Sequence, residues 1–302
     1  MEVAILGCYA ATPTTSHRPT SQVLSIGNHL FLIDCGEGTQ TQLRRQKIKF
    51  SRIKHIFISH LHGDHFYGLI GLIATFGLLD RKTPLHIYGP KGIKEIITLQ
   101  LKLSKSWTGF PLYFHELEQK TPEIIFQDDK VSVETIPLDH RVYTNGFLFK
   151  EALGDRKLLI DKVDEYQIDV AYYKSIKKGK DVPDNNGNLI ANKLLTAPPP
   201  PPKSYAFCSD TAFKPELATQ LKNTSVLYHE ATFLERHKHL CEKTKHTTAK
   251  QAATLAKMAA VKKLILGHYS TRYGSIEVFK QEAEQVFPEV LLAEDGKKFK
   301  FD

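Results

Sequence analysis

The 302-residue sequence contains few of the residues that mark disulfide-rich or metal-thiolate proteins. It has only four cysteines, namely Cys8, Cys35, Cys208 and Cys241. No two of them form a Cys-x-x-Cys pair, and their density is too low for a disulfide scaffold in a chain of this length. We therefore expect reduced and mostly buried thiols in a cytoplasmic protein.

Long apolar runs and an acidic excess are also missing. No run approaches the roughly 18 residues that a membrane span requires, and the N-terminal residues lack the basic and apolar regions of a secretory signal. We therefore expect no membrane partner. Lys and Arg total 41 against 33 Asp and Glu, a net charge of +8 that permits a polyanionic partner without proving one. The hydrophobic content of 41% excludes disorder as the dominant state.

Short strand-like runs alternate with helix-like stretches along the chain, which indicates an α/β fold. The dipeptide Gly27-Asn28 between two such runs predicts a hairpin, so the sheets should be mixed rather than purely parallel. We expect strands at residues 3–6, 22–26, 29–33, 55–59, 85–88, 131–137, 204–207, 225–228 and 263–266. We expect helices at residues 38–46, 66–79, 91–103, 247–260 and 276–286.

Residues 151–202 differ from the rest of the chain in composition. They are rich in charged and turn-forming residues and end in five consecutive prolines, Pro198 to Pro202, which favour a stiff, extended spacer. A structureless loop of this length is unusual in a compact domain. We interpret residues 151–202 as an insertion projecting from a single domain of residues 1–302. A long solvated loop without a function is the alternative.

The strongest pattern is His60-Leu61-His62-Gly63-Asp64-His65, which follows a strand-like run. Imidazole nitrogens and carboxylate oxygens are natural zinc ligands. Four such ligands are too many for one catalytic zinc and too few for two, so further ligands should come from other strand ends. His140, Asp210 and His268 each follow an apolar run. Taken singly such a residue is more often structural, but together with the first cluster they supply seven ligands, enough for two metals.

These residues carry a resemblance to a known family. The spacing His60-x-His62-x-Asp64-His65 is the signature of the metallo-β-lactamase superfamily, and Asp34 matches that superfamily's first motif. Within the superfamily, the chain resembles the short form of the ribonuclease Z family, the tRNA 3′-processing endoribonucleases, nearly from end to end. The element His229-Glu230-Ala231-Thr232 is its most specific piece. The loops His17-Arg18-Pro19 and Pro198–Pro202 depart from the family's usual pattern.

The resemblance implies a four-layer αββα sandwich of two mixed sheets with a protruding arm. It also implies two zinc ions per subunit, and Asp34 would orient one of the ligand histidines; a simple helix cap is the alternative for Asp34. The first zinc would be bound by His60, His62, His140 and Asp210. The second would be bound by Asp64, His65, Asp210 and His268.

The resemblance further implies a hydrolase that cleaves precursor tRNA near the discriminator base and removes the 3′ trailer. The products would be a 3′-hydroxyl on the tRNA and a 5′-phosphate on the trailer. Such hydrolysis needs an oriented water and a proton for the departing oxygen. We assign Asp64 the base role and His246 the acid role, with Glu230 holding the tautomer of His246 and raising its pKa. For His246, a structural residue at a helix start is the alternative.

The family's arm clamps tRNA away from the active site, and residues 151–202 match it. We expect the tip of the arm at residues 172–180, where Lys174, Lys177, Lys178 and Lys180 suit contact with phosphates. The family is typically a homodimer in which the arm of one subunit serves the active site of the other.

Two other interpretations stay open. The ligand set alone is compatible with another hydrolase on the same fold, such as a small-molecule phosphodiesterase, an arylsulfatase-like enzyme or a lactamase, because a fold does not determine a substrate. A non-catalytic RNA-binding protein with a relic metal site is the second alternative. Such a protein would lack a metal ligand or the proton-donating residue, and neither is missing from this sequence.

Overall fold

The computed structural model describes residues 1–301, which divide into two compact units. The larger unit comprises residues 1–150 together with the chain from residue 203 onward, and the smaller comprises residues 151–202. Within the described residues, no helix is long and apolar enough to cross a membrane. All four cysteines are free and buried, as the sequence predicts.

The larger unit is built on two seven-stranded sheets. The strands of the first sheet are β1 (Glu2–Gly7), β2 (Ser21–Ile26), β3 (His29–Ile33), β4 (Ile53–Phe57), β5 (Leu85–Pro90), β6 (Leu112–Leu117) and β18 (Lys298–Lys300). Those of the second sheet are β7 (Ile124–Gln127), β8 (Val131–Pro137), β9 (Asn145–Glu151), β14 (Ser204–Cys208), β15 (Val226–Glu230), β16 (Lys263–Gly267) and β17 (Val290–Leu292).

Both sheets are mixed. The first has the order β18-β1-β2-β3-β4-β5-β6, with antiparallel pairing from β18 to β3 and parallel pairing from β3 to β6. The second has the order β17-β16-β15-β14-β9-β8-β7, in which β14 to β17 are parallel and β9 is antiparallel to β14. The parallel strands of each sheet end at a common edge, and these edges carry the residues described below.

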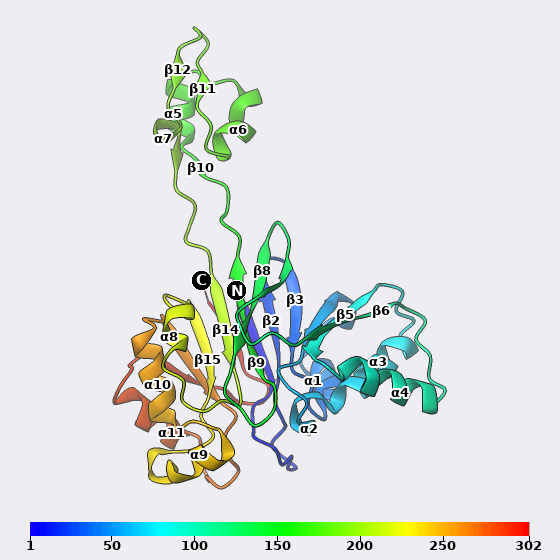
Figure 1. Ribbon diagram of the computed structural model, residues 1–302. Coiled ribbons are helices and arrows are strands. Elements are labelled where there is room, and N and C mark those ends of the chain that lie inside the picture. The colour runs from blue at the N-terminus through cyan, green and yellow to red at the C-terminus, as the bar shows by residue number, and fades with distance from the viewer. Residues whose placement is uncertain (302) are drawn as a thin grey trace. The chain divides into compact units, whose positions relative to one another are not determined.

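Helices cover the outer face of each sheet, so the larger unit has four layers (Figure 1). The first sheet is covered by α1 (Thr39–Arg45), α3 (Gly68–Leu78) and α4 (Ile93–Leu103). The second is covered by α8 (Leu217–Gln220), α10 (Ala249–Met258) and α11 (Glu277–Glu284). The short helices α2 (Gly63–Phe66) and α9 (His239–Thr244) lie in connecting segments.

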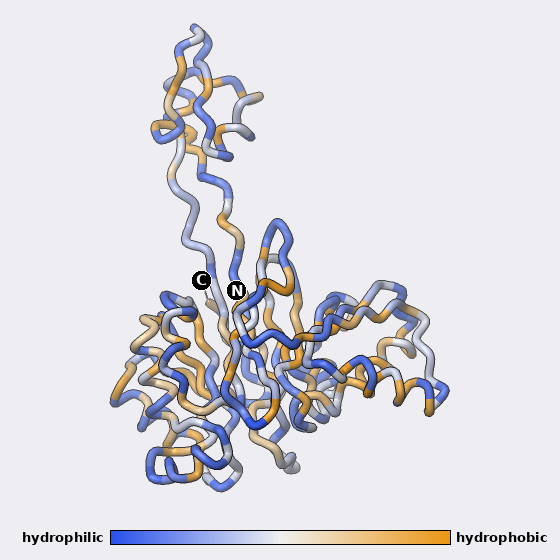
Figure 2. Tube along the Cα trace, viewed as in Figure 1, coloured by the Kyte–Doolittle hydropathy of each residue, from blue (hydrophilic) through white to orange (hydrophobic). Residues whose placement is uncertain are grey.

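The core between the sheets is rich in aromatic side chains. Phe57 of the first sheet lies with its ring centroid 5.3 Å from those of Phe147 and Phe149 of the second. All three side chains are fully buried, and burial of one such ring is worth about 1.5–3 kcal/mol. Figure 2 shows apolar residues along the strands and hydrophilic residues in several connecting turns. This packing holds the two sheets face to face and therefore fixes the relative positions of their edges.

Every predicted strand and helix has a counterpart, with shifted ends in most cases. The hairpin prediction is confirmed, because β2 and β3 pair antiparallel around Gly27 and Asn28, whose φ angles are 52° and 71°. The helix expected at residues 66–79 is divided between α2 and α3, and the strand expected at 55–59 begins earlier, at Ile53. Strands β6, β7, β9, β17 and β18 of the larger unit were not predicted.

The smaller unit has a core of its own, made by Val163, Ile168, Ile176, Val182 and Leu195. Its elements are β10 (Lys157–Leu158), α5 (Ile160–Glu165), α6 (Tyr173–Lys177), β11 (Val182–Pro183), β12 (Leu189–Ile190), α7 (Asn192–Leu195) and β13 (Thr196–Ala197). Strands β10 and β13, where the chain enters and leaves, pair with each other, and β11 and β12 form a hairpin.

One expectation about this unit is wrong. Residues 172–180 are not its tip, because Lys178 forms a 2.7 Å ion pair with Asp155 and the carbonyl of Lys177 accepts a 3.0 Å hydrogen bond from the amide of Arg156. Asp155 and Arg156 lie where the chain enters the unit. The turn of the β11–β12 hairpin lies farthest from that entry (Figure 1). Composition alone could locate the charged residues but not the elements that carry them.

Candidate metal centre

The candidate ligands, and Asp34 which contacts one of them, lie at strand ends along one edge of the two sheets. Asp34 follows β3, the run His60–His65 follows β4, Asp210 follows β14 and His268 follows β16. Asp34, Asp210 and His268 have φ angles of 55°, 59° and 57°. This left-handed conformation is uncommon for residues other than glycine and recurs at functional sites. It reverses the chain abruptly where each strand ends.

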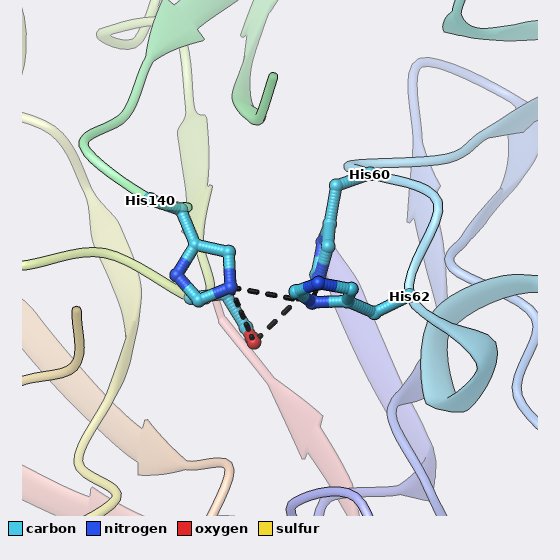
Figure 3. Close-up of side chains that lie close together, drawn as sticks. His60, His62 and His140 are labelled. Carbon is cyan, nitrogen blue, oxygen red and sulfur yellow. Dashed lines mark hydrogen bonds and ion pairs between the residues drawn. The ribbon is translucent and has the colours of Figure 1, made fainter. Parts of the chain in front are cut away.

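A first group of side chains consists of His60, His62, His140 and Asp210 (Figure 3). His62 Nδ1 lies 3.0 Å from His60 Nε2 and 3.3 Å from His140 Nε2. Asp210 Oδ2 lies 3.6 Å from His60 Nε2 and 3.8 Å from His140 Nε2. Three imidazole nitrogens and a carboxylate oxygen therefore converge on one point, as in a four-coordinate zinc site.

A second group consists of Asp64, His65 and His268. Asp64 Oδ2 lies 3.4 Å from His65 Nε2 and 3.7 Å from His268 Nε2. The other oxygen of Asp210, Oδ1, lies 3.2 Å from His65 Nε2 and 3.1 Å from His268 Nε2. Asp210 thus directs one oxygen to each group.

The chemistry of the second group fits a metal ion. The Nε2 atoms of His65 and His268 are buried and form no hydrogen bond, an arrangement that is costly unless a ligand completes it. The neighbouring histidine charges hold the pKa of the buried Asp210 carboxyl well below its usual range, although burial acts in the opposite direction. An ionised carboxylate between buried imidazole nitrogens that face it is the donor set that a divalent metal takes.

The other ring nitrogen of these histidines is held by a neighbouring group. Asp34 Oδ2 lies 2.7 Å from His65 Nδ1, and Ser59 Oγ lies 3.0 Å from His60 Nδ1. Thr232 Oγ1 lies 2.9 Å from His268 Nδ1, and the carbonyl of Lys245 accepts from His140 Nδ1 at 3.1 Å. Such contacts fix the orientation of a metal-ligating ring.

Ser59, Thr232 and the Lys245 carbonyl were not predicted as site residues. Ser59 directly precedes the histidine cluster, and Thr232 belongs to the His229–Thr232 element that carried the family resemblance. These two positions had a signal that could have been used. The Lys245 contact is made by a backbone oxygen, and no side-chain pattern indicates it.

His246 and Glu230 form a pair beside the two groups. Their Nδ1 and Oε1 atoms are 2.8 Å apart, and Glu230 is fully buried. Although burial lowers the pKa of His246, the carboxylate of Glu230 raises it to about 9. Burial likewise opposes ionisation of Glu230, but the charge of His246 lowers its pKa to about 2. Ligand atoms of His246, Asp210 and His268 lie within 4.8 Å of one another, so a proton donor lies next to the candidate metal centre.

The four lysines expected to bind RNA are Lys174, Lys177, Lys178 and Lys180, and all are exposed in the smaller unit. Lys174 and Lys177 lie on α6, and Lys178 is engaged by Asp155. Three of the four therefore have no carboxylate partner within residues 1–301.

Comparisons with known proteins give the relatives of this chain. A family model described as Anti-Pycsar protein Apyc1 matches residues 1–161. Ribonuclease Z of Bacteroides fragilis is 47% identical over 295 residues, which cover 98% of this chain and 97% of that protein. Ribonuclease Z of Cytophaga hutchinsonii is 45% identical over 299 residues, covering 99% and 95%.

Solved structures agree with these relatives. Human tRNase Z, short form (ELAC1), superposes with a TM-score of 0.73 at 27% identity, covering 99% of each chain. The metallo-β-lactamase fold protein YhfI of Bacillus subtilis superposes with a TM-score of 0.69 at 17% identity, covering 99% of this chain and 98% of that one. The predicted αββα metallo-β-lactamase fold is confirmed.

Proposed function

Because the chain belongs to the ribonuclease Z family, and its residues 1–161 also to the family described as Anti-Pycsar protein Apyc1, we propose that it removes the 3′ trailer of precursor tRNA. It is a hydrolytic endoribonuclease. Cleavage near the discriminator base would leave a 3′-hydroxyl on the tRNA and a 5′-phosphate on the trailer. The observation that carries this proposal is the His246–Glu230 pair, a proton donor 2.8 Å from its partner and adjacent to seven clustered candidate ligands.

Two zinc ions per subunit are the proposed cofactors. One would be held by His60, His62, His140 and Asp210, and the other by Asp64, His65, Asp210 and His268. When bound, the two ions supply a hydroxide at neutral pH and neutralise the phosphate oxygens. Two imidazole nitrogens without hydrogen bonds, and a carboxylate shared between the groups, support this assignment.

The protein's own groups would orient the water and move the protons. Asp64 Oδ2 faces the nitrogens of His65 and His268 and accepts a 3.0 Å hydrogen bond from the amide of Ala11. From this position it would accept a hydrogen bond from the attacking water and direct it at the phosphorus. His246 Nε2 would donate a proton to the departing 3′ oxygen while Glu230 accepts from Nδ1. General acid catalysis of this kind contributes about 10²–10⁴-fold to a rate.

Paired precursors test the proposed reaction. Two transcripts of one precursor tRNA, one with and one without an encoded CCA, are incubated with the zinc-loaded protein, and the product ends are mapped. The expected result is a tRNA ending in a 3′-hydroxyl and a trailer beginning with a 5′-phosphate. A protein that hydrolyses a small phosphodiester but leaves both precursors intact would support the small-molecule alternative instead.

His246→Ala separates proton donation from metal binding. The expected result is a loss of about 10²–10⁴-fold in precursor cleavage with an unchanged zinc content. A variant that loses zinc but keeps its turnover per bound metal would refute the acid role.

The smaller unit is proposed to bind the tRNA away from the metal centre. Its exposed lysines are suited to phosphate contacts, which weaken as salt rises. Replacement of Lys174, Lys177 and Lys180 by glutamine should weaken precursor binding and flatten its salt dependence without affecting hydrolysis of a small phosphodiester. Equal losses on both substrates would refute the RNA-binding role. A homodimer in the cytoplasm remains part of the proposal; sedimentation of the purified protein tests the former.

A further inference from the structure

Residues 44–54 form an unusual surface, called here the basic segment. It contains six cations and no carboxylate: Arg44, Arg45, Lys47, Lys49, Arg52 and Lys54. All six are exposed, and none of them forms an ion pair within residues 1–301. Many other lysines of the larger unit are neutralised, for example Lys91 by Glu118 at 3.1 Å and Lys263 by Glu289 at 3.2 Å. The positive charge of the basic segment is therefore left free to meet an external anion.

The backbone holds the basic segment in a defined shape. Helix α1 ends at Arg45, the chain turns at Lys47 with a φ of 56°, and a single 3₁₀ turn spans Phe50–Arg52. Lys298 of the neighbouring strand β18 donates a 3.3 Å hydrogen bond to the carbonyl of Gln46. Because the segment is anchored at both ends by α1 and β4, its cations are displayed on a folded surface rather than on a free loop.

The basic segment lines two adjoining hollows. One, of ≈ 270 Å³, is bordered by four cations, Lys47, Lys49, Arg52 and Lys298, and by one carboxylate, Glu2. The other, of ≈ 470 Å³, is bordered by Lys49 and Phe50 and by Lys82, which is ion-paired with Asp80 of the same hollow. Lys49 belongs to both.

An aromatic ring lies among these cations. The guanidinium of Arg44 lies 5.3 Å from the ring centroid of Phe50, which is itself partly exposed. An arginine side chain can donate two parallel hydrogen bonds to two oxygens of one phosphate, and aromatic rings and guanidinium groups stack on nucleic-acid bases. The combination suits a nucleic-acid strand, which offers both phosphates and base faces, better than a carboxylate-rich protein, which offers no planar bases.

The basic segment lies at the opposite end of the sheet from the candidate metal centre. Helix α1 begins just after Asp34 and runs away from that centre, and β4 begins at Ile53 and runs back to His60. The seven steps along the extended chain from Ile53 to His60 span roughly 23 Å at about 3.3 Å per step. An anion on the basic segment is therefore on the order of 20 Å from the scissile phosphate, too far to be part of the same nucleotide.

We propose that the basic segment is a second RNA-binding surface, which holds the phosphate backbone of the substrate RNA about 20 Å from the cleaved bond. The inference rests on the proposed function, since it requires a substrate long enough to reach both places. Stacked nucleotides rise about 3.4 Å each, so the contact lies roughly six nucleotides from the cleavage point. It is separate from the lysines of residues 151–202, which belong to the other compact unit.

The test compares two triple variants that remove the same charge. Lys47→Gln/Lys49→Gln/Arg52→Gln alters the basic segment, whereas Lys91→Gln/Lys263→Gln/Lys280→Gln removes three lysines that are ion-paired on the same unit. Both are measured with zinc-loaded full-length protein for dissociation of a precursor tRNA at a series of salt concentrations. Both are also assayed for hydrolysis of bis(p-nitrophenyl) phosphate, which reports folding and the metal centre.

The basic-segment variant should bind the precursor about 10- to 100-fold more weakly near physiological salt, because each lost phosphate contact lowers the salt slope by roughly 0.7–0.9. Its slope should fall by about 2–3, and the control variant should change little. Turnover of the small diester should equal that of the unaltered protein in both. The proposal is overturned if the two variants bind the precursor equally well.

A length series tests the position of the contact. RNAs that retain the cleavage site but are shortened stepwise should lose the difference between the variant and the unaltered protein once fewer than roughly six nucleotides remain on the contacted side. The side on which shortening acts identifies whether the trailer or the tRNA body is held. A defect independent of length would refute the second surface. If the unaltered protein cleaves no precursor at all, the proposed function fails. If it cleaves the precursor but the basic-segment and control variants bind equally well, only the second RNA-binding surface fails.

Discussion

Glu230→Gln should make proton donation by His246 depend on pH. Glu230 is fully buried, and its Oε1 accepts from the amide of Thr211 at 3.1 Å as well as lying 2.8 Å from His246 Nδ1. Its Oε2 accepts from the amide and the hydroxyl of Thr232 at 3.0 and 2.7 Å. A glutamine has nearly the same shape but no charge, and its amide nitrogen cannot accept any of these bonds.

The size of the effect follows from the pKa of His246. Burial lowers this pKa, and the Glu230 carboxylate raises it to about 9. Without the carboxylate, burial still lowers this pKa and the charge of Asp210 still raises it, so we take the ordinary value of about 6.5 as the reference for the variant. At pH 8 the protonated fraction then falls from about 90% to about 3%, roughly 30-fold. At pH 6 most of the His246 side chains are protonated in both proteins, and the protonated fraction falls by less than about 2-fold.

The pH-dependent loss is measured as the single-turnover rate of precursor tRNA cleavage by the zinc-loaded variant, relative to the unaltered protein, between pH 6 and 8. The surface substitution Glu277→Gln removes the same charge from an exposed helix position and should behave like the unaltered protein. Bis(p-nitrophenyl) phosphate needs no proton donor, since p-nitrophenolate leaves unprotonated, and should show no pH-dependent loss. A precursor-cleavage defect of equal size at pH 6 and pH 8 would refute the assignment of Glu230 as the group that keeps His246 protonated.

Three further predictions concern the metal centre and the fold. Asp34→Asn should weaken zinc binding by about 10- to 100-fold, measured by competition with a chelator, because the amide holds its partner histidine less well; unchanged affinity contradicts this. EDTA should lower the free energy of unfolding by roughly 2.7 kcal/mol per zinc site, or about 5.4 kcal/mol for two sites, relative to zinc at 100 times its dissociation constant, with recovery when zinc is restored. Ala260→Gly, at an exposed position with a φ of 50°, should stabilise by about 1 kcal/mol in urea unfolding, whereas Thr254→Gly within α10 should destabilise; the opposite order would disprove the strain.

Two of the strands that sequence analysis missed, β9 and β6, have identifiable physical causes. In β9, the pair Asn145-Gly146 looks like a turn. The structure shows why glycine is there: a Cβ at Gly146 would lie 2.3 Å from the carbonyl oxygen of Phe207 on the adjacent strand β14. In β6, most side chains are exposed or half-exposed because the strand forms an edge of its sheet, so the alternation of buried and exposed residues is weak. The close approach of β14 to Gly146 and the edge position of β6 are both set by strands distant in sequence, so neither can be inferred from the local sequence.

The candidate site was predictable to the extent that its residues are local or of a distinctive type. The run His60–His65 gathers four donors in six residues, and the strand-end positions of Asp210 and His268 indicated further ones. What spacing could not provide is which nitrogen of each ring faces inward. His62 presents Nδ1 and His60 presents Nε2, and this difference is set by contacts such as that of Ser59 with His60 Nδ1.

The backbone at the candidate site shows how the fold supports its function. Asp34, Asp210 and His268 occupy the left-handed conformation, which costs on the order of 1 kcal/mol or more for each residue with a side chain. Local preference alone would not keep them there. Asp34 is held because its amide donates to the Phe57 carbonyl at 2.8 Å and its carboxylate accepts from the Ser59 amide at 2.7 Å. Packed neighbouring strands therefore impose the conformation that turns the ligands Asp210 and His268, and the positioning residue Asp34, toward the centre. The site thus depends on the completed sheets rather than on any single segment.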